Sequence, residues 1–186
     1  MIPQWQLPDR AVIGGREYPI HADYRDILEI FGYLEDPALP EYLRWQIALA
    51  LFYEGQIPPE DHREAMAYLA EFINGGQPQA GPPGPKLLDW QQDAPAIAAE
   101  VNKAAGCEIR AIPFLHWWTF LAYFNAIGQG QLSTIVAIRD KLRRGKALEG
   151  WEKDFYRENK ARVDLKPRYS PQELEEQARL QALLGE

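Results

Sequence analysis

The sequence is poor in the residues and patterns on which most catalytic sites depend. It contains one cysteine, Cys107, which excludes an internal disulfide and suits a reducing compartment. Its three histidines are scattered, and none lies three or four residues from another histidine or from the cysteine, so no metal-ligand spacing is present. Glycine patterns that cradle phosphates and the nucleophile-elbow pattern are also missing. We therefore expect no catalysis, no cofactor and no metal site.

Long apolar runs and an excess of positive charge are missing as well. The most apolar stretch, residues 112–127, is shorter than the roughly 20 residues needed to span a bilayer. The N-terminal residues do not have the pattern of a secretory signal. The net charge of −7 argues against nucleic acid as a main partner, because phosphate binding depends on clustered Lys and Arg. These absences predict a cytosolic protein that binds neither membrane nor nucleic acid.

Helical periodicity dominates what is there. The chain has 186 residues, of which 46% are hydrophobic, so it can bury a core. Two short β-prone runs flank Gly14 and Gly15 and predict a hairpin over residues 11–20. We expect a mainly α fold, a bundle of about seven to eight helices with a small N-terminal β-hairpin. The expected helices cover residues 23–34, 41–53, 60–73, 89–105, 113–127, 131–144, 148–160 and 170–184.

A segment rich in glycine and proline interrupts these helices. Residues 74–85 contain four Gly and four Pro and no hydrophobic residue larger than alanine. This composition is typical of a loop or linker. It divides the chain into an N-terminal part, 1–73, with the hairpin and three helices, and a C-terminal part, 86–186, with the basic helices and a terminal arm. The sequence leaves open whether the two parts pack as one domain.

The stretch Leu115–Leu121 is apolar on every side and must be covered. We expect it to supply a structural core, with His116 bonded internally to a backbone carbonyl and a polar side chain. A catalytic pair of Cys107 with His116 is the less favoured alternative. Asp89 and Asp93 are interpreted as the acidic first turn of a helix rather than as an acid–base pair. The predicted core residues are Leu115, His116, Trp117, Trp118, Phe120 and Leu121.

Charge is segregated along the chain. Residues 139–168 carry eleven Lys and Arg against six Asp and Glu, a net of +5, so the rest of the chain carries −12. A basic strip of this kind can steer an acidic protein partner. Contact with nucleic acid through its aromatic residues is the weaker option, because acids are interleaved. The candidate partner-binding residues are Arg139, Arg143, Arg144, Trp151 and Tyr156 in the basic helices, and Leu174 and Leu183 in the terminal arm.

Three motifs together resemble the bacteriophage gene-product-fifteen family. They are Asp89-Trp90-Gln91-Gln92-Asp93 followed by Ile97, then Leu115-His116-Trp117-Trp118-Thr119-Phe120, then Ile135-Val136-Ala137-Ile138-Arg139. The family pattern has an aromatic residue between two aspartates, an LHWW core and a helix that ends in arginine. The resemblance extends over about residues 10–165, and the LHWW motif is its most specific part.

The resemblance implies a function that the composition alone does not. Members belong to the tail-gene module of tailed phages and prophages, between the tube and tape-measure genes. This implies a tail assembly chaperone of the host cytoplasm that binds the tape measure protein, with the tail tube protein as a further candidate partner. A structural virion component, such as a completion or connector protein, is the alternative, and a small enzyme ranks third. A homo-oligomer is left open.

Overall fold

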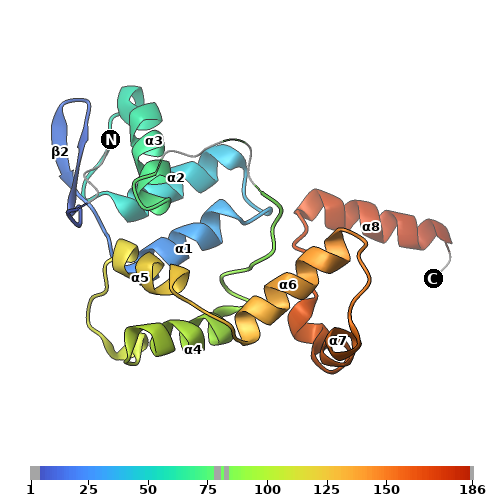
Figure 1. Cartoon of the computed structure of the whole chain (residues 1–186). Coiled ribbons are helices and arrows are strands. Elements are labelled where there is room, and N and C mark those ends of the chain that lie inside the picture. Colours follow the sequence, from blue (N-terminus) through green and yellow to red (C-terminus); the bar gives the residue numbers. More distant parts are fainter. Residues whose placement is uncertain (1–4, 78–80, 82–83, 185–186) are drawn as a thin grey trace. The chain divides into compact units, whose positions relative to one another are not determined.

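The computed structural model describes residues 5–77, 81 and 84–184, and the side chains among them as far as residue 182. In these residues it has eight α-helices, two short 3-10 helices and one two-stranded antiparallel sheet (Figure 1). The predicted mainly α fold with an N-terminal hairpin is therefore confirmed. The chain forms two compact units: unit 1 comprises Met1–Pro78 and Pro167–Glu186, and unit 2 comprises Gln79–Lys166. Each is described by itself.

Unit 1 begins with the predicted hairpin. Strand β1, Arg10–Ile13, pairs antiparallel with β2, Arg16–Pro19. Gly14 and Gly15 form the turn with φ of 56° and 74°, a region that favours glycine. Because side chains alternate along a strand, one face of the hairpin is buried and the other is exposed. The buried side chains are those of Ala11, Ile13 and Tyr18.

Three helices support the hairpin, since two strands alone are barely stable. Asp23 caps the first of them as predicted, because its carboxylate accepts a hydrogen bond from the Arg25 N–H. The chain beyond β2 forms a bridge between Ile20 and Tyr53, which ties the hairpin to the end of the second helix. The elements are α1 (Tyr24–Leu34), α2 (Glu41–Phe52), the 3-10 helix η1 (Pro59–Asp61) and α3 (His62–Ile73).

An aromatic cluster holds α2 and α3 together. The ring of Phe52 lies 4.8 Å from that of Tyr53 and 5.0 Å from that of Phe72, centroid to centroid. The Tyr53 hydroxyl donates to the Ala65 carbonyl at 2.9 Å. Burial raises the pKa of Tyr53, and the nearby Tyr68 and Glu64 groups raise it further, which favours the protonated hydroxyl that makes this hydrogen bond.

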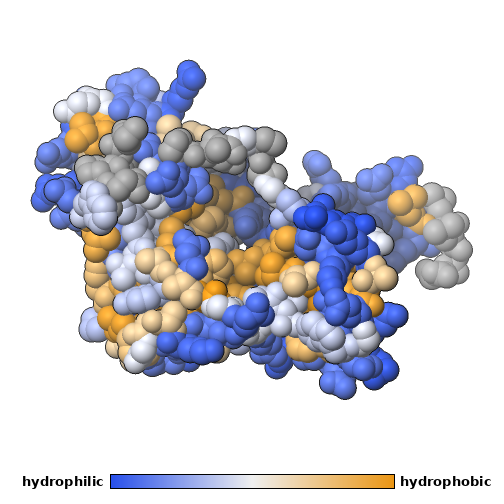
Figure 2. All heavy atoms as spheres, in the orientation of Figure 1, coloured by the Kyte–Doolittle hydropathy of each residue, from blue (hydrophilic) through white to orange (hydrophobic). Residues whose placement is uncertain are grey.

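Helix α8, Pro171–Leu184, also groups with unit 1. Its N-terminus has the capping box that the sequence predicts: Ser170 Oγ accepts from the Glu173 N–H, and Glu173 accepts from the Ser170 N–H. Every side chain from 171 to 182 is exposed. Most of the surface of α8 in Figure 2 is accordingly hydrophilic. The helix therefore contributes no described side chain to a core.

Unit 2 contains the four other helices, and two of them begin later than the sequence predicts. Residues 90–93 form a turn, so the helix expected from residue 89 begins at Ala94. The helix expected from Pro113 begins at Trp117, because residues 112–116 are not helical and His116 is its cap. The elements are α4 (Ala94–Ala105), the 3-10 helix η2 (Ile109–Ala111), α5 (Trp117–Asn125), α6 (Gln131–Arg143) and α7 (Gly150–Val163).

Candidate functional site

A buried ion pair joins two of the motifs in unit 2. Arg139 on α6 forms two hydrogen bonds with the Asp93 carboxylate, Nη1 to Oδ2 at 2.6 Å and Nη2 to Oδ1 at 2.9 Å. The two side chains are 5% and 3% exposed, so the pair is shielded from water. Such a two-pronged geometry is the strongest form of this interaction. It connects the turn before α4 to the C-terminal half of α6.

The remaining donors of Arg139 bind backbone carbonyls. Nε donates to Val163, Nη1 to Leu87 and Nη2 to Arg162, at 2.6, 2.9 and 2.8 Å. All five N–H groups of the guanidinium are thus satisfied. The prediction that Arg139 contacts a partner is therefore wrong. Its side chain instead links α6 to the end of α7, through Arg162 and Val163, and to Leu87 before α4.

Asp89 stabilises the turn at residues 90–93, which ends at Asp93. Its Oδ1 accepts from the N–H groups of Gln91 and Gln92 at 3.0 and 2.8 Å. Burial acts to raise the pKa of Asp89, but the hydrogen bond from Gln92 and those from Lys86 and Gln91 outweigh it, so the pKa is lowered. The carboxylate stays charged as a turn cap. This agrees with a structural role for Asp89, although the sequence placed it inside a helix.

The LHWW motif packs against Trp90, the aromatic residue between Asp89 and Asp93, in an aromatic cluster. Trp117 and Phe120 of α5 stack at 5.4 Å, and the Trp90 ring lies 5.9 Å from Trp117 and 5.2 Å from Phe124. Trp117 and Phe120 are each 1% exposed. All three motifs of the resemblance therefore converge inside unit 2. Of the predicted core, Leu115, His116, Trp117 and Phe120 are buried, and Trp118 and Leu121 are half-buried.

His116 is buried, and one of its ring nitrogens has a role that was not predicted. Its Nδ1 accepts a hydrogen bond from the Trp118 N–H at 3.0 Å and so caps the N-terminus of α5. A helix N-terminus leaves backbone N–H groups without partners, and an acceptor satisfies one of them. Cys107, its suggested catalytic companion, is exposed whereas His116 is 5% exposed.

The other residues proposed for partner contact lie in different settings. Arg143 and Arg144 are exposed and pair with Asp140, at 3.0 and 2.9 Å. Trp151 is 58% exposed and accessible to a partner. Tyr156 is half-buried against the core of Ile135, Ile138 and Val163, and its hydroxyl donates to Asp164 at 2.8 Å. Leu174 is 52% exposed, and the Leu183 side chain lies outside the described residues.

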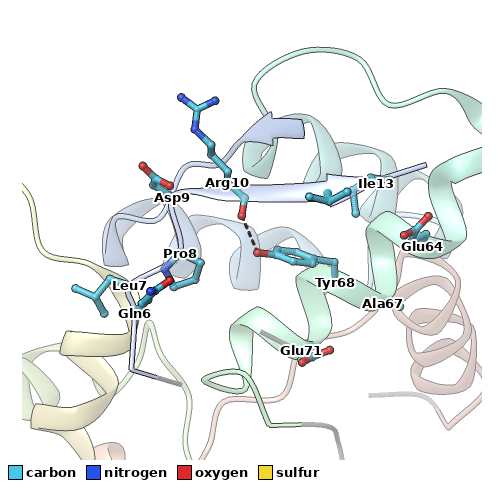
Figure 3. Close-up of a pocket in the computed structure, with 11 residues that line it drawn as sticks. Gln6, Leu7, Pro8, Asp9, Arg10, Ile13, Glu64, Ala67, Tyr68 and Glu71 are labelled. Atoms are coloured by element: carbon cyan, nitrogen blue, oxygen red, sulfur yellow. Dashed lines mark hydrogen bonds between the residues drawn. The ribbon is translucent and has the colours of Figure 1, made fainter. Parts of the chain in front are cut away.

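A hollow of about 570 Å³ on unit 1 was not predicted from the sequence. It lies between α3 and the chain around β1, and Figure 3 shows Tyr68 reaching from α3 so that its hydroxyl donates to the Arg10 carbonyl, at 3.0 Å. The carboxylates of Asp9, Glu64 and Glu71 line it. Burial, and then the charges of Glu71 and Asp9, raise the pKa of Tyr68 to about 12. The hollow is therefore an electronegative surface with an aromatic floor.

Within the described residues, no group of three or more His, Cys, Asp and Glu is arranged to hold a metal ion. In the same part of the chain, no helix is both long and apolar enough to cross a membrane. The arrangements in unit 2 are hydrogen bonds, caps and packed rings whose roles are structural. Exposed residues remain on α6, α7 and α8, and the hollow lies on unit 1.

A comparison of the sequence with known protein families gives a match that includes all three motifs. Residues 6–165 match the model of the family described as Bacteriophage Gp15 protein. The chain belongs to this family. The match runs from the segment before the hairpin to the end of α7, so it spans most of both units and leaves out α8. Membership identifies a structural or assembly protein of a bacteriophage. Searches of curated proteins and of solved structures found no match.

Proposed function

We propose that this protein is a tail assembly chaperone that binds the tape measure protein and keeps it soluble while the tail tube assembles. It acts without catalysis, in the host cytoplasm. Family membership supports a role in phage assembly, and the finer role follows from the surfaces that the fold leaves unused. A tape measure is expected to expose long apolar helices, for which a chaperone must offer apolar side chains of its own.

Helix α8 is the observation that carries this proposal. It is 14 residues long, and in water an isolated helix of this length is only marginally stable. Leu174 and Leu180 are each 52% exposed. The two leucines are six residues apart, so they lie about 120° apart around the helix axis. A client that packs across both positions would bury them, and each buried leucine contributes about 1.5–3 kcal/mol. A client helix that packs along α8 would therefore stabilise α8, and the same contact would shield the apolar surface of the client from water.

The surface of α6 and α7, in unit 2, supplies a second contact area. Trp151 is 58% and Leu142 is 38% exposed. Leu142 is flanked in sequence by basic residues, and the Trp151 ring N–H donates a hydrogen bond to Glu149 at 3.2 Å. Tryptophan is enriched in residues that dominate binding energy at interfaces. The surrounding charges give a polar rim, which keeps affinity moderate, so the tube protein can displace the chaperone.

The test is co-expression with the tape measure protein of the same phage. The soluble fraction of the tape measure is measured with the wild type, with the double variant L174E/L180E, and with the control Q172E/Q177E. Both double variants add two negative charges to α8, but only the first removes leucines. We expect the first to lose the solubilising effect and the control to keep it.

Two results count against the proposal. If the wild-type chain leaves the tape measure insoluble and does not co-purify with it, the chaperone role is excluded. If purified phage particles contain the chain in a fixed ratio to the tube protein, the structural virion component becomes the better explanation, because an assembly chaperone leaves the finished tail. Mass spectrometry of particles and of infected-cell lysate separates these cases.

A further inference from the structure

A second hollowed surface on unit 1 runs along α2, where this helix borders α3. It consists of two adjoining hollows of about 380 and 300 Å³, and Gln46, Leu49 and His62 line both of them. We call this surface the α2–α3 groove. It extends along most of α2, which is about 18 Å long. The other lining residues come from α2, α3 and the chain between them: Glu41, Tyr42, Trp45, Ala50, Gly55, Gln56, Ile57, Pro59 and Met66.

The groove is lined by apolar side chains that are partly exposed. Tyr42 is 67% exposed, and Trp45 and Met66 are half-buried. Tyr42, Trp45 and Leu49 follow one another at spacings of three and four residues, so they form one stripe along α2. An apolar stripe of this kind on a helix is normally covered by another element. The stripe is therefore a surface that a partner can cover.

The shape of the groove suits a helix as the occupant. Side chains three and four residues apart form ridges on a helix, and the ridges of one helix pack between those of another. A helix in the groove would contact α2 through Tyr42 and Trp45 and α3 through Met66. An extended peptide would instead need a row of free backbone partners, as at the edge of a sheet. Between their ends, the backbone groups of α2 and α3 bond within each helix, so these two helices offer no such row.

The charges around the groove are negative. Glu41 lines its first hollow, and Glu54 and Glu60 are exposed and adjoin in sequence residues that line the second one. Neither hollow has a Lys or Arg among its described lining residues. Of the residues that the structure describes, none forms an ion pair with these three carboxylates. A partner with cationic groups near the two ends of its helix would therefore meet charges of opposite sign.

We propose that the α2–α3 groove binds an amphipathic helix of a partner protein, which packs its apolar face over Tyr42, Trp45 and Leu49 and carries Lys or Arg near its ends. The exposed helix of a second copy, α8, fits less well, because its three Glu and one Arg leave it negative. The inference does not depend on the tape measure being the client, since no residue of the groove belongs to the proposed contact on α6, α7 and α8.

Binding to the full chain is measured by fluorescence anisotropy. The probe is a fluorescent peptide as long as α2, stapled into a helix, with a leucine stripe along one face and lysines at both ends. One control peptide has the same composition in scrambled order and thus no leucine stripe. A second control peptide has glutamate in place of lysine.

Two variants act on the groove, and each has a matched control. Y42A removes the most exposed ring of the stripe, whereas F114A removes a ring that is 58% exposed in unit 2. A50R places a long cationic side chain in the second hollow, whereas A67R places one on α3 outside the groove. All four positions are exposed, so we expect the variants to fold, which circular dichroism checks.

We expect Y42A to weaken binding of the lysine peptide by roughly five- to thirtyfold, the range for an important aromatic residue of an interface, and A50R to abolish it. F114A and A67R should change binding by less than about twofold. Unchanged binding with Y42A, or equal losses with A50R and A67R, would overturn the proposal. Equal binding of either control peptide would overturn it as well, because the apolar stripe and the lysines would then not matter. If the chain self-associates in sedimentation and A50R abolishes that, the occupant is a second copy and the partner assignment is wrong.

Discussion

The Arg139–Asp93 pair gives the sharpest test of how unit 2 is held together. Replacing Arg139 with Met keeps much of the side-chain volume but removes all five donors. Asp93, 4% exposed, then keeps only the hydrogen bond that its Oδ2 accepts from the Asp89 N–H, at 2.9 Å. Removing one partner of a buried pair costs about 3–5 kcal/mol, because an uncompensated charge stays inside.

This loss is large against the stability of a typical domain, which is about 5–15 kcal/mol. We therefore expect R139M to leave unit 2 close to its unfolding threshold. The double variant D93N/R139M should be less destabilised than R139M alone, because the buried charge is gone. Arg157→Met, which breaks a pair whose side chains are 75% and 62% exposed, should change stability by no more than about 0.5 kcal/mol.

The assay is urea unfolding followed by tryptophan fluorescence. Four of the six tryptophans lie in unit 2, so the signal reports mainly on this unit. If the free energy of unfolding of R139M lies within about 1 kcal/mol of the wild-type value, the pair does not stabilise unit 2 to the expected extent. An unpaired buried charge is expected to cost far more than that. The reasoning about buried charge also fails if D93N/R139M is no more stable than R139M.

Three further outcomes test local features. Replacing His116 with Ala should cost about 1 kcal/mol of stability by removing the helix cap, whereas Asn at this position should retain most of it, as measured by urea unfolding. Gly14→Ala should destabilise more than Gly15→Ala in thermal unfolding, since both sites have positive φ but only the added Cβ at Gly14 meets another side chain. The hydrogen bond from Lys141 lowers the pKa of Glu152, so its stabilising effect is present above its unfolded value of 4.5 and is lost as pH falls through the lower folded value. The stability difference between wild type and E152Q should therefore shrink below pH 4.5, and a constant difference would contradict this.

Features encoded by neighbouring residues could be predicted from the sequence. The hairpin follows from two glycines between alternating strands, and the caps at Asp23 and Ser170 follow from side chains two or three residues from the N–H groups they accept. In these cases the interacting atoms are close in the chain. No long-range information was needed to place the turn or the first residue of either helix.

Features that depend on distant residues could not be predicted. Arg139 looks like any surface arginine on a basic helix, but its carboxylate partner is 46 positions away, and only the folded structure brings the two together. The late start of α5 has a related cause. An apolar run with proline near its beginning predicts a helix from there, yet the side chain of His116 can cap only the N–H groups that follow it, so the helix begins at Trp117.

The position of the motifs decides what the family match says about function. Asp93, Trp117 and Arg139 carry the resemblance, and all three are buried in contacts within unit 2. A match through such residues constrains the fold, because they cannot touch a partner without unfolding the unit. The proposed client contact must therefore depend on exposed residues, such as those of α8, which lies beyond the matched residues 6–165. This contact has to be tested with the full chain, α8 included.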